Sequence, residues 1–315
     1  MSDFKSISGG ICAPKGFSAA GVHCGIRHNH SKLDLALIKA DVRCAGAGCY
    51  TTNKVYGAPI TVDREHLKDG YAQAIVVNSG NANTCAPNGV QLAKDTCDIV
   101  AKELGIRADD VLPSSTGVIG QAMSIEPFAR GIPEAAAKLA ADEAGSHDAA
   151  TAIMTTDTIP KECAVRARLS DGTLIYVAAI SKGSGMISPH MQVLHGTTLS
   201  LITTDATLGP DFAEVWQSIL DDTMNMVSVD GDTSTNDMVT VLANGLAGNA
   251  EITAEGEDFT AFMQALNTVT VYLCRCIAGD GEGATKLLEC KASGAATLDI
   301  AKTVAKSVIC SSLTK

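Results

Sequence analysis

Aromatic side chains are scarce in this sequence, at 4% of its 315 residues, whereas glycine occurs 29 times. A core with so few rings must be built from alanine, valine, leucine, isoleucine and threonine in closely packed layers. Hydrophobic residues make up 46% of the chain, enough to bury the core of one large domain or two smaller ones. This composition argues against a disordered chain and favours a sheet-based protein that also contains helices.

Positive charge is also in short supply. Lys and Arg number 24 against 35 Asp and Glu, which gives a net charge of −11. Such a balance argues against binding to nucleic acid or to anionic lipid. No apolar run reaches the roughly 18–20 residues of a membrane span, and the N-terminus lacks the basic and apolar parts of a signal peptide. We therefore expect a cytoplasmic protein.

The eleven cysteines include no Cys-x-x-Cys pair, and they are spread from Cys12 to Cys310. A chain of this length does not need disulfides, so we interpret the cysteines as reduced thiols that fill the core. The densest group of potential metal ligands lies in an irregular, glycine-flanked stretch whose spacing does not fit a zinc site: His23, Cys24, His28 and His30. We expect neither a metal nor another resident cofactor.

Two stretches that contain glycine partly resemble nucleotide-binding and calcium-binding loops. Residues 279–286 contain no Gly-Lys-Ser/Thr, and their acidic side chains would repel phosphate. Residues 230–237 begin like a calcium loop, but Thr235 stands where that loop needs glycine and Val241 where it needs a bidentate glutamate. The first stretch is therefore not a P-loop, and the second is interpreted as a polar turn that satisfies its own backbone.

Hydrophobic periodicity predicts both strands and helices. Strands are expected at residues 33–40, 74–77, 163–169, 174–181, 198–203 and 238–243. Helices with apolar stripes toward the core are expected within residues 92–104, 212–219, 259–273 and 301–308. Ser170-Asp171-Gly172-Thr173 is typical of a hairpin turn. The strands outnumber what one helix layer covers, so we expect helices on both outer faces, in an α+β arrangement of the αββα type.

Short polar residues cluster at several expected strand ends. Residues 78–83 can expose backbone N–H groups to a ligand. Residues 114–120 can present two adjacent amides, as an oxyanion hole requires, although a turn before a strand is the simpler explanation. Residues 155–158 and 203–205 repeat a threonine pattern that β-propensity alone also accounts for. Spacing does not decide between these interpretations.

One segment suggests covalent chemistry. Residues 182–189 are rich in glycine and serine, and Gly196-Thr197-Thr198 then opens an apolar strand. A threonine after a small residue can attack the preceding carbonyl, and hydrolysis of the resulting ester makes that threonine an N-terminus. Its α-amine, with an ordinary pKa of about 7.7–8.0, is then partly neutral and serves as the base. No Gly-x-Ser-x-Gly elbow offers another nucleophile.

Together these stretches resemble the bifunctional glutamate N-acetyltransferase/ornithine acetyltransferase family of arginine biosynthesis. The resemblance runs from Gly10 to the last residue. The matching stretches follow one another in the family's order: residues 13–17, 51–55, 78–83, 116–120, 153–158, 182–187, 202–206, 229–237 and 281–286.

The resemblance implies an αββα sandwich similar to but distinct from the N-terminal-nucleophile hydrolases. It implies a precursor that cleaves itself between Gly196 and Thr197, so that residues 1–196 form an alpha chain and residues 197–315 a beta chain. Thr197 would be the nucleophile. The same resemblance implies further catalytic residues, namely Thr116 and Gly117 of the oxyanion hole and Glu282, and substrate-binding residues, namely Thr155, Lys182, Thr197 and Glu282.

The activity implied is transfer of acetyl from N-acetylornithine to the threonine hydroxyl and then to glutamate, with acetyl-CoA as a possible second donor. The implied partners are these small molecules and the two chains of the protein's own precursor, paired as a heterotetramer of two alpha and two beta chains. Two alternatives stay open: an amidohydrolase that uses the same threonine with water as acceptor, and an uncleaved, truncated relative without catalysis.

The sequence departs from the family pattern at two places. Between Pro189 and Leu199 it carries about four more residues than the family's Pro-x-Met-Ala-Thr-Met-Leu. Counting back from Ile202 puts the nucleophile at Thr197, whereas counting forward from Pro189 puts it at Val193, which has no hydroxyl. We prefer Thr197, because a buried strand fixes register more strictly than a loop. Family chains also continue for several tens of residues past the match to Lys315, with an Asn and a Ser or Thr implicated in substrate binding.

Overall fold

The computed structural model describes residues 4–188, 198–209 and 212–315. Within these ranges the strands form one nine-stranded sheet in the order β1-β6-β7-β8-β9-β3-β4-β5, and β2 pairs with β3 beside this path. The strands are β1 (Lys5–Ile7), β2 (Phe17–Val22), β3 (Leu35–Tyr50), β4 (Tyr71–Asn81), β5 (Val111–Val118), β6 (Lys161–Arg168), β7 (Leu174–Lys182), β8 (Leu199–Thr204) and β9 (Met238–Ala243). The α-helices are α1 (Ala58–His66), α2 (Gly89–Leu104), α3 (Glu126–Ala137), α4 (Glu143–Ala152), α5 (Phe212–Asp222), α6 (Glu257–Gly279) and α7 (Leu298–Ile309).

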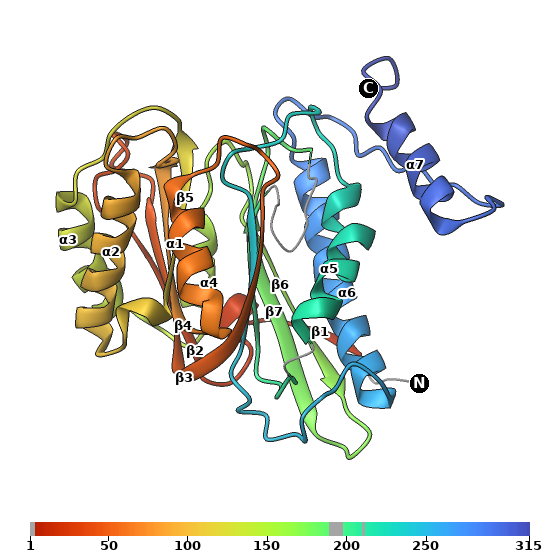
Figure 1. The fold of residues 1–315 in the computed structure, drawn as a ribbon, viewed down its shortest axis with the longest axis horizontal. Helices are drawn as coiled ribbons and strands as arrows, with labels where there is room; N and C mark the ends of the chain where they lie inside the picture. The colour runs from red at the N-terminus through yellow and green to blue at the C-terminus, as the bar shows by residue number, and fades with distance from the viewer. Residues whose placement is uncertain (1–3, 189–197, 210–211) are drawn as a thin grey trace.

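Strand β3 belongs to both halves of this sheet. Its residues 35–40 lie between β2 and β4 and run antiparallel to both, whereas residues 45–50 pair with β9. The register with β4 shifts between Lys39 and Cys44, and irregularities of this kind bend a strand. Figure 1 shows β3 curving from the half that carries β4 and β5 toward the half that carries β6 and β7.

Successive side chains of each strand point to opposite faces of the sheet and therefore pack in different core layers. On β4, Val76 packs in a core with residues of α2 and α3, whereas Ile75 faces a middle layer between the two halves. On β9, Val241 packs with residues of α5 and α6, and Leu242 joins Ile75 in the middle layer. The order of layers is therefore helix, sheet, sheet, helix (Figure 1), which confirms the predicted αββα sandwich.

The elements with pronounced periodicity are where the sequence predicts them. All six predicted strands are present, as β3, β4, β6, β7, β8 and β9, and the four predicted helices are α2, α5, α6 and α7. The hairpin between β6 and β7 is confirmed by a bond of 2.9 Å from Leu169 N to Thr173 O. Six elements are not predicted from the sequence pattern: β1, β2, β5, α1, α3 and α4.

One prediction about a helix was wrong, because the apolar stripe of α7 does not face the core. No residue of α7 is buried, and Val304 and Val308 are 50% and 38% exposed. The helix stands apart from the sandwich in Figure 1. It is linked to the segment after α5 by a hydrogen bond of 2.7 Å from Lys306 Nζ to Asn225 O. Periodicity reveals an amphipathic helix but not what covers it. None of the helices in the described ranges has the length and apolarity to cross a bilayer.

The carboxyl group of Asp63 on α1 is fully buried, and neither oxygen has a hydrogen-bond partner among the described residues. Burial raises the pKa of this carboxyl well above its usual range. The folded protein therefore keeps a proton that the unfolded chain releases above about pH 4. The free energy of unfolding consequently falls as the pH rises from there toward the pKa of the folded state.

We predict that Asp63→Asn raises the melting temperature at pH 8 by on the order of 2 °C or more, and that this gain shrinks toward pH 4. Asn carries no charge at any pH, so the variant lacks the fall in unfolding free energy that the buried Asp63 carboxyl causes in the wild type as the pH rises. Calorimetry between pH 4 and pH 8 measures the difference. Asp98→Asn, at an exposed position of α2, is the matched control and should show no such trend. A melting temperature below that of the wild type at pH 8 would contradict the prediction.

Candidate active site

Five residues predicted for the site line one pocket of about 570 Å³, which suits a ligand of amino-acid size. They come from the end of β5, the turn after α4, the end of β7 and the segment after α6: Thr116, Gly117, Thr155, Lys182 and Glu282. Gly196, Thr197 and the alternative Val193 lie outside the described residues. Strand β8 begins beside the pocket, because Leu199 pairs with Lys182.

The pocket wall at Thr116 and Gly117 is the end of a strand and not the turn that the sequence suggested. β5 runs parallel to β4, and the register shifts where Gly117 passes Gly80. Gly117 has φ +135°, and a Cβ atom there would lie 2.3 Å from the carbonyl carbon of Gly80. Only glycine allows the two strands to approach so closely. The strand pairing is irregular at the point where the end of β5 lines the pocket.

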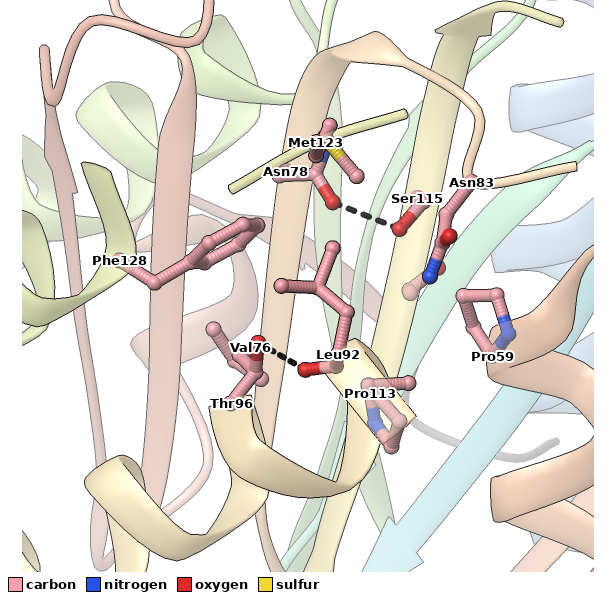
Figure 2. Close-up of a pocket in the computed structure, with 12 residues that line it drawn as sticks. Pro59, Val76, Asn78, Asn83, Leu92, Thr96, Pro113, Ser115, Met123 and Phe128 are labelled. Carbon is pink, nitrogen blue, oxygen red and sulfur yellow. Dashed lines mark hydrogen bonds between the residues drawn. The ribbon is translucent and has the colours of Figure 1, made fainter. Parts of the chain in front are cut away.

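A second cavity lies between α2 and the strands β4 and β5 (Figure 2). It measures about 10 Å³, roughly the space of one water molecule, so it cannot hold a substrate. Figure 2 shows the side chains of Asn78 and Ser115 pointing toward each other there, and Ser115 Oγ donates a hydrogen bond of 2.6 Å to Asn78 Oδ1. Asn78 Nδ2 in turn donates to Asn81 O at 2.8 Å. These bonds fix the end of β5 relative to β4.

Lys182 brings a positive charge to the oxygen of Thr116. Its Nζ atom donates a hydrogen bond of 3.2 Å to Thr116 Oγ1, and the residue is only 9% exposed. Burial lowers the pKa of the Lys182 ammonium, although the carboxylates of Asp157 and Asp237 oppose this effect. An ammonium group held in this way stabilises negative charge that develops on a nearby oxygen.

A second cation in the pocket wall, Arg27, was missed by the sequence analysis. Its Nε donates a hydrogen bond of 3.1 Å to Ser79 Oγ, and its terminal amino group donates to Met154 O. The backbone N–H of Arg27 donates to Asp34 Oδ2 at 2.9 Å. Nothing in the local sequence marks this arginine, because the partners of its side chain, Ser79 and Met154, lie far along the chain.

Arg27 lies in the histidine-rich stretch that was considered for a metal. His23 Nε2 lies 3.1 Å from His30 Nδ1. No three His, Cys, Asp or Glu side chains of the described part of the chain are arranged to hold a metal ion.

The stretch 230–237, which the sequence analysis interpreted as a polar turn, forms the acidic side of the pocket. Asp230 accepts hydrogen bonds from the backbone N–H groups of Met186 at 2.6 Å and Ile187 at 2.9 Å. Asn236 Nδ2 donates to Ala82 O at 2.5 Å and to Ser115 O at 2.9 Å. The stretch is thus bonded both to the segment after β7 and to the end of β5.

The carboxylate of Glu282 lies close to the backbone on the same side of the pocket. A Cβ atom on Gly185 would lie 2.5 Å from Glu282 Oε1, so the glycine leaves room for this carboxylate. Glu282, Asp230 and Asp232 therefore give the pocket a negative side, opposite in charge to Arg27 and Lys182. Such a pocket suits a ligand that carries charges of both signs.

Acyl transfer requires fixed positive charge or hydrogen-bond donors where a carbonyl oxygen becomes an oxyanion, and the buried ammonium of Lys182 beside the end of β5 offers such a charge. The fold and this pocket define an αββα-sandwich enzyme of the acyltransferase class. Residues 18–315 match the ArgJ family. The chain belongs to this family of arginine biosynthesis bifunctional proteins.

Curated relatives match almost the whole chain. The arginine biosynthesis bifunctional protein ArgJ of Symbiobacterium thermophilum is 46% identical over 312 residues, which is 98% of this chain and 76% of that protein. The protein of the same name from Thermotoga neapolitana is 44% identical over 306 residues, 96% of this chain and 75% of that protein. The chain thus spans about three quarters of the length of these relatives.

Solved structures agree with the family. ArgJ of Bacillus halodurans has a TM-score of 0.58 at 34% identity and covers 61% of this chain and 100% of its own. Ornithine acetyltransferase of Mycobacterium tuberculosis, complexed with ornithine, has a TM-score of 0.55 at 32% identity and covers 60% of this chain and 100% of its own. A β-aminopeptidase of Burkholderia shares the fold at 12% identity, with a TM-score of 0.53 and coverage of 88% and 89%.

We predict that Gly117→Ala destabilises the protein by about 2 kcal/mol or more, because it combines an unfavourable φ with a backbone clash against Gly80. Urea unfolding measures the change. Gly120→Ala is the matched control: that glycine also has a positive φ, of +81°, but nothing lies within 4 Å of its Cβ position. Equal losses of unfolding free energy in the two variants would show that the clash with Gly80 does not contribute to the destabilisation.

Proposed function

We propose that this chain transfers an acetyl group from N-acetylornithine to glutamate through an acetyl ester on Thr197. The observation that carries the proposal is the buried bond between Lys182 Nζ and Thr116 Oγ1 in a pocket with one positive and one negative side. It is supported by relatives named as arginine biosynthesis bifunctional proteins and by similarity to an ornithine acetyltransferase that binds ornithine. The assignment of Thr197 rests on the register of β8 in the sequence.

In the first half-reaction the Thr197 hydroxyl attacks the acetyl carbonyl, and the free α-amine of the same residue takes the hydroxyl proton. The resulting oxyanion accepts hydrogen bonds from the backbone N–H groups of Thr116 and Gly117 beside the Lys182 ammonium. The carbon–nitrogen bond then breaks, and the departing amine of ornithine takes the proton. The products are ornithine and acetyl-Thr197.

In the second half-reaction the neutral amine of glutamate attacks the ester at the same carbonyl, and the α-amine of Thr197 takes a proton from the attacking nitrogen. The same donors stabilise the second oxyanion. The threonine oxygen then leaves and takes this proton, which gives N-acetylglutamate and free Thr197. Lys182, together with Arg27 in the pocket wall, provides charge for the carboxylate that both substrates share, and Thr155 and Glu282 complete their binding. No resident cofactor is needed, and acetyl-CoA fits the first half-reaction as another acetyl donor.

The same chemistry requires maturation of the precursor. We propose cleavage between Gly196 and Thr197 into an alpha chain of residues 1–196 and a beta chain of residues 197–315. The two chains stay associated and pair as a heterotetramer in the cytoplasm. An amidohydrolase would differ only in its acceptor, which is water, and a non-catalytic relative would remain uncleaved.

We predict that Thr197→Ala abolishes cleavage and leaves an intact chain of 32.4 kDa. Alanine has no hydroxyl, so the acyl shift onto the side chain cannot begin. Mass spectrometry and N-terminal sequencing after incubation at neutral pH provide the measurement. Thr198→Ala is the control and should still cleave. Wild-type protein that stays intact, without a new threonine N-terminus, would favour the non-catalytic alternative.

We predict that Lys182→Met lowers kcat for acetyl transfer by about 10²-fold, because it removes the charge beside the oxyanion. In the wild type kcat should fall as the pH rises through the lowered pKa of Lys182, which lies below the usual value of about 10.4. Lys182→Arg keeps the charge and should lose this alkaline decline.

The assay measures labelled N-acetylglutamate formed from N-acetylornithine and labelled glutamate. Release of ornithine without this product would establish the amidohydrolase. An unchanged kcat in Lys182→Met would exclude Lys182 from stabilising the oxyanion.

A further inference from the structure

Behind the pocket lies a fully buried lysine, Lys161, that neither the sequence motifs nor the proposed mechanism uses. Its side chain is 0% exposed. Nζ donates hydrogen bonds to Asp157 Oδ1 at 2.7 Å, to Asp280 Oδ2 at 2.6 Å and, with a longer bond of 3.5 Å, to Ile159 O. An ammonium group has three donors, and all three are engaged here. Lys161 therefore has no donor left for a substrate, so any role in the reaction has to act through its partners.

Asp157, the first partner, holds two segments of the pocket. Its Oδ2 atom accepts a hydrogen bond of 3.0 Å from the N–H of Thr155, and Oδ1 accepts one of 2.7 Å from the N–H of Gly183, next to Lys182. Burial alone would raise the pKa of this carboxyl, but the charges of Lys182 and Lys161 outweigh it and lower the pKa. Asp157 is therefore a carboxylate held between two ammonium groups.

Asp280, the second partner, lies two residues before Glu282. It accepts a hydrogen bond of 3.0 Å from the N–H of Thr158 and another from the hydroxyl of Thr158. Its side chain is only 7% exposed. The segment that carries Glu282 is thus bonded to the turn that carries Thr155, and Lys161 lies between the two carboxylates.

We propose that Asp157, Lys161 and Asp280 form a positioning triad that sets the relative places of Thr155, Lys182 and Glu282 for substrate binding. The inference rests on the proposed function, because it assumes that these three residues bind substrate. The triad also joins residues on both sides of the proposed cleavage point, since Asp157 and Lys161 precede residue 197 and Asp280 follows it. It therefore keeps the substrate-binding residues in register after the chain is cut.

A buried ion cluster with a purely structural role would have different consequences. It would lower the melting temperature and the fraction of active enzyme, but the KM of the molecules that do fold would stay the same. A positioning role changes KM, because a displacement of about 1 Å in a binding group weakens the hold on both substrates. Separate measurement of KM and kcat therefore distinguishes a positioning role from a purely structural one.

The decisive variant is Asp280→Asn, which keeps one oxygen as acceptor for the N–H of Thr158 but removes the charge that pairs with Lys161 and the second oxygen, which accepts from the hydroxyl of Thr158. We expect KM for N-acetylornithine and for glutamate to rise about tenfold, with a smaller change in kcat. Lys161→Met, which removes the cation from between the carboxylates of Asp157 and Asp280, should raise KM further where it folds. If Lys161→Met does not fold, Asp280→Asn alone tests the proposal.

Asp110→Asn is the matched control. Asp110 is also a buried carboxylate with an arginine partner, Arg43, at 2.8 Å, but it precedes β5 and lies at the other end of that strand from Thr116. It should lower the melting temperature and leave both KM values at the wild-type level.

Calorimetric binding of ornithine provides a readout that does not depend on turnover, and Asp280→Asn should weaken it about tenfold. A folded Asp280→Asn protein with KM values and ornithine affinity within twofold of the wild type would overturn the triad. Wild-type protein that binds ornithine but forms no N-acetylglutamate would overturn only the proposed function, and the triad would still be judged on the affinity of the variant. Wild-type protein that does not bind ornithine would overturn both.

Discussion

Both halves of the sandwich depend on the bend of β3, which is hydrogen-bonded to β2, β4 and β9 along its 16 residues. On one side β3 aligns β4, and β4 aligns β5 with Thr116 near its end. On the other side β3 aligns β9, then β8, then β7 with Lys182 at its end. β5 and β7 are not neighbours in the sheet, so the bond between Lys182 and Thr116 spans the two halves. The pocket forms where the end of β5 in one half meets the end of β7 in the other.

The elements that the sequence predicted are those whose own apolar pattern is long and regular. β5 was missed because Pro113-Ser114-Ser115 is typical of a turn, and it is a strand only because β4 and the helices around it bury it. α3 contains Pro133, and α4 has few large apolar residues. Asp142, the N-cap residue that precedes α4, accepts a hydrogen bond from Gly145 N through its side chain. The opposite error, an expected core face on α7, arose because amphipathicity shows that a helix has an apolar face and not where that face lies.

The residues that the motifs predicted for the site are brought to one pocket, but the contacts that hold them there could not be read from one sequence. Lys161 and Asp280 are 119 residues apart, and Arg27 and Met154 are 127 apart. Such pairs leave no local signal, because each residue considered alone is an ordinary charged side chain. The matching stretch 51–55 also makes a contact that is distant in sequence. Thr51 Oγ1 donates a hydrogen bond of 2.6 Å to Ser234 O and so helps to fix the acidic side of the pocket.

The charges in the pocket also bear on how an acidic protein can bind an anionic amino acid. A protein with a net charge of −11 repels an anionic amino acid such as glutamate at long range. On one side of the pocket Arg27 and Lys182 oppose this repulsion, and low solvent exposure strengthens the field of these cations. Both cations come from residues before the proposed cleavage point, whereas Asp230, Asp232 and Glu282 come from residues after it. A ligand with charges of both signs therefore contacts both proposed chains at once, and its binding energy adds to the contacts that hold the cut protein together.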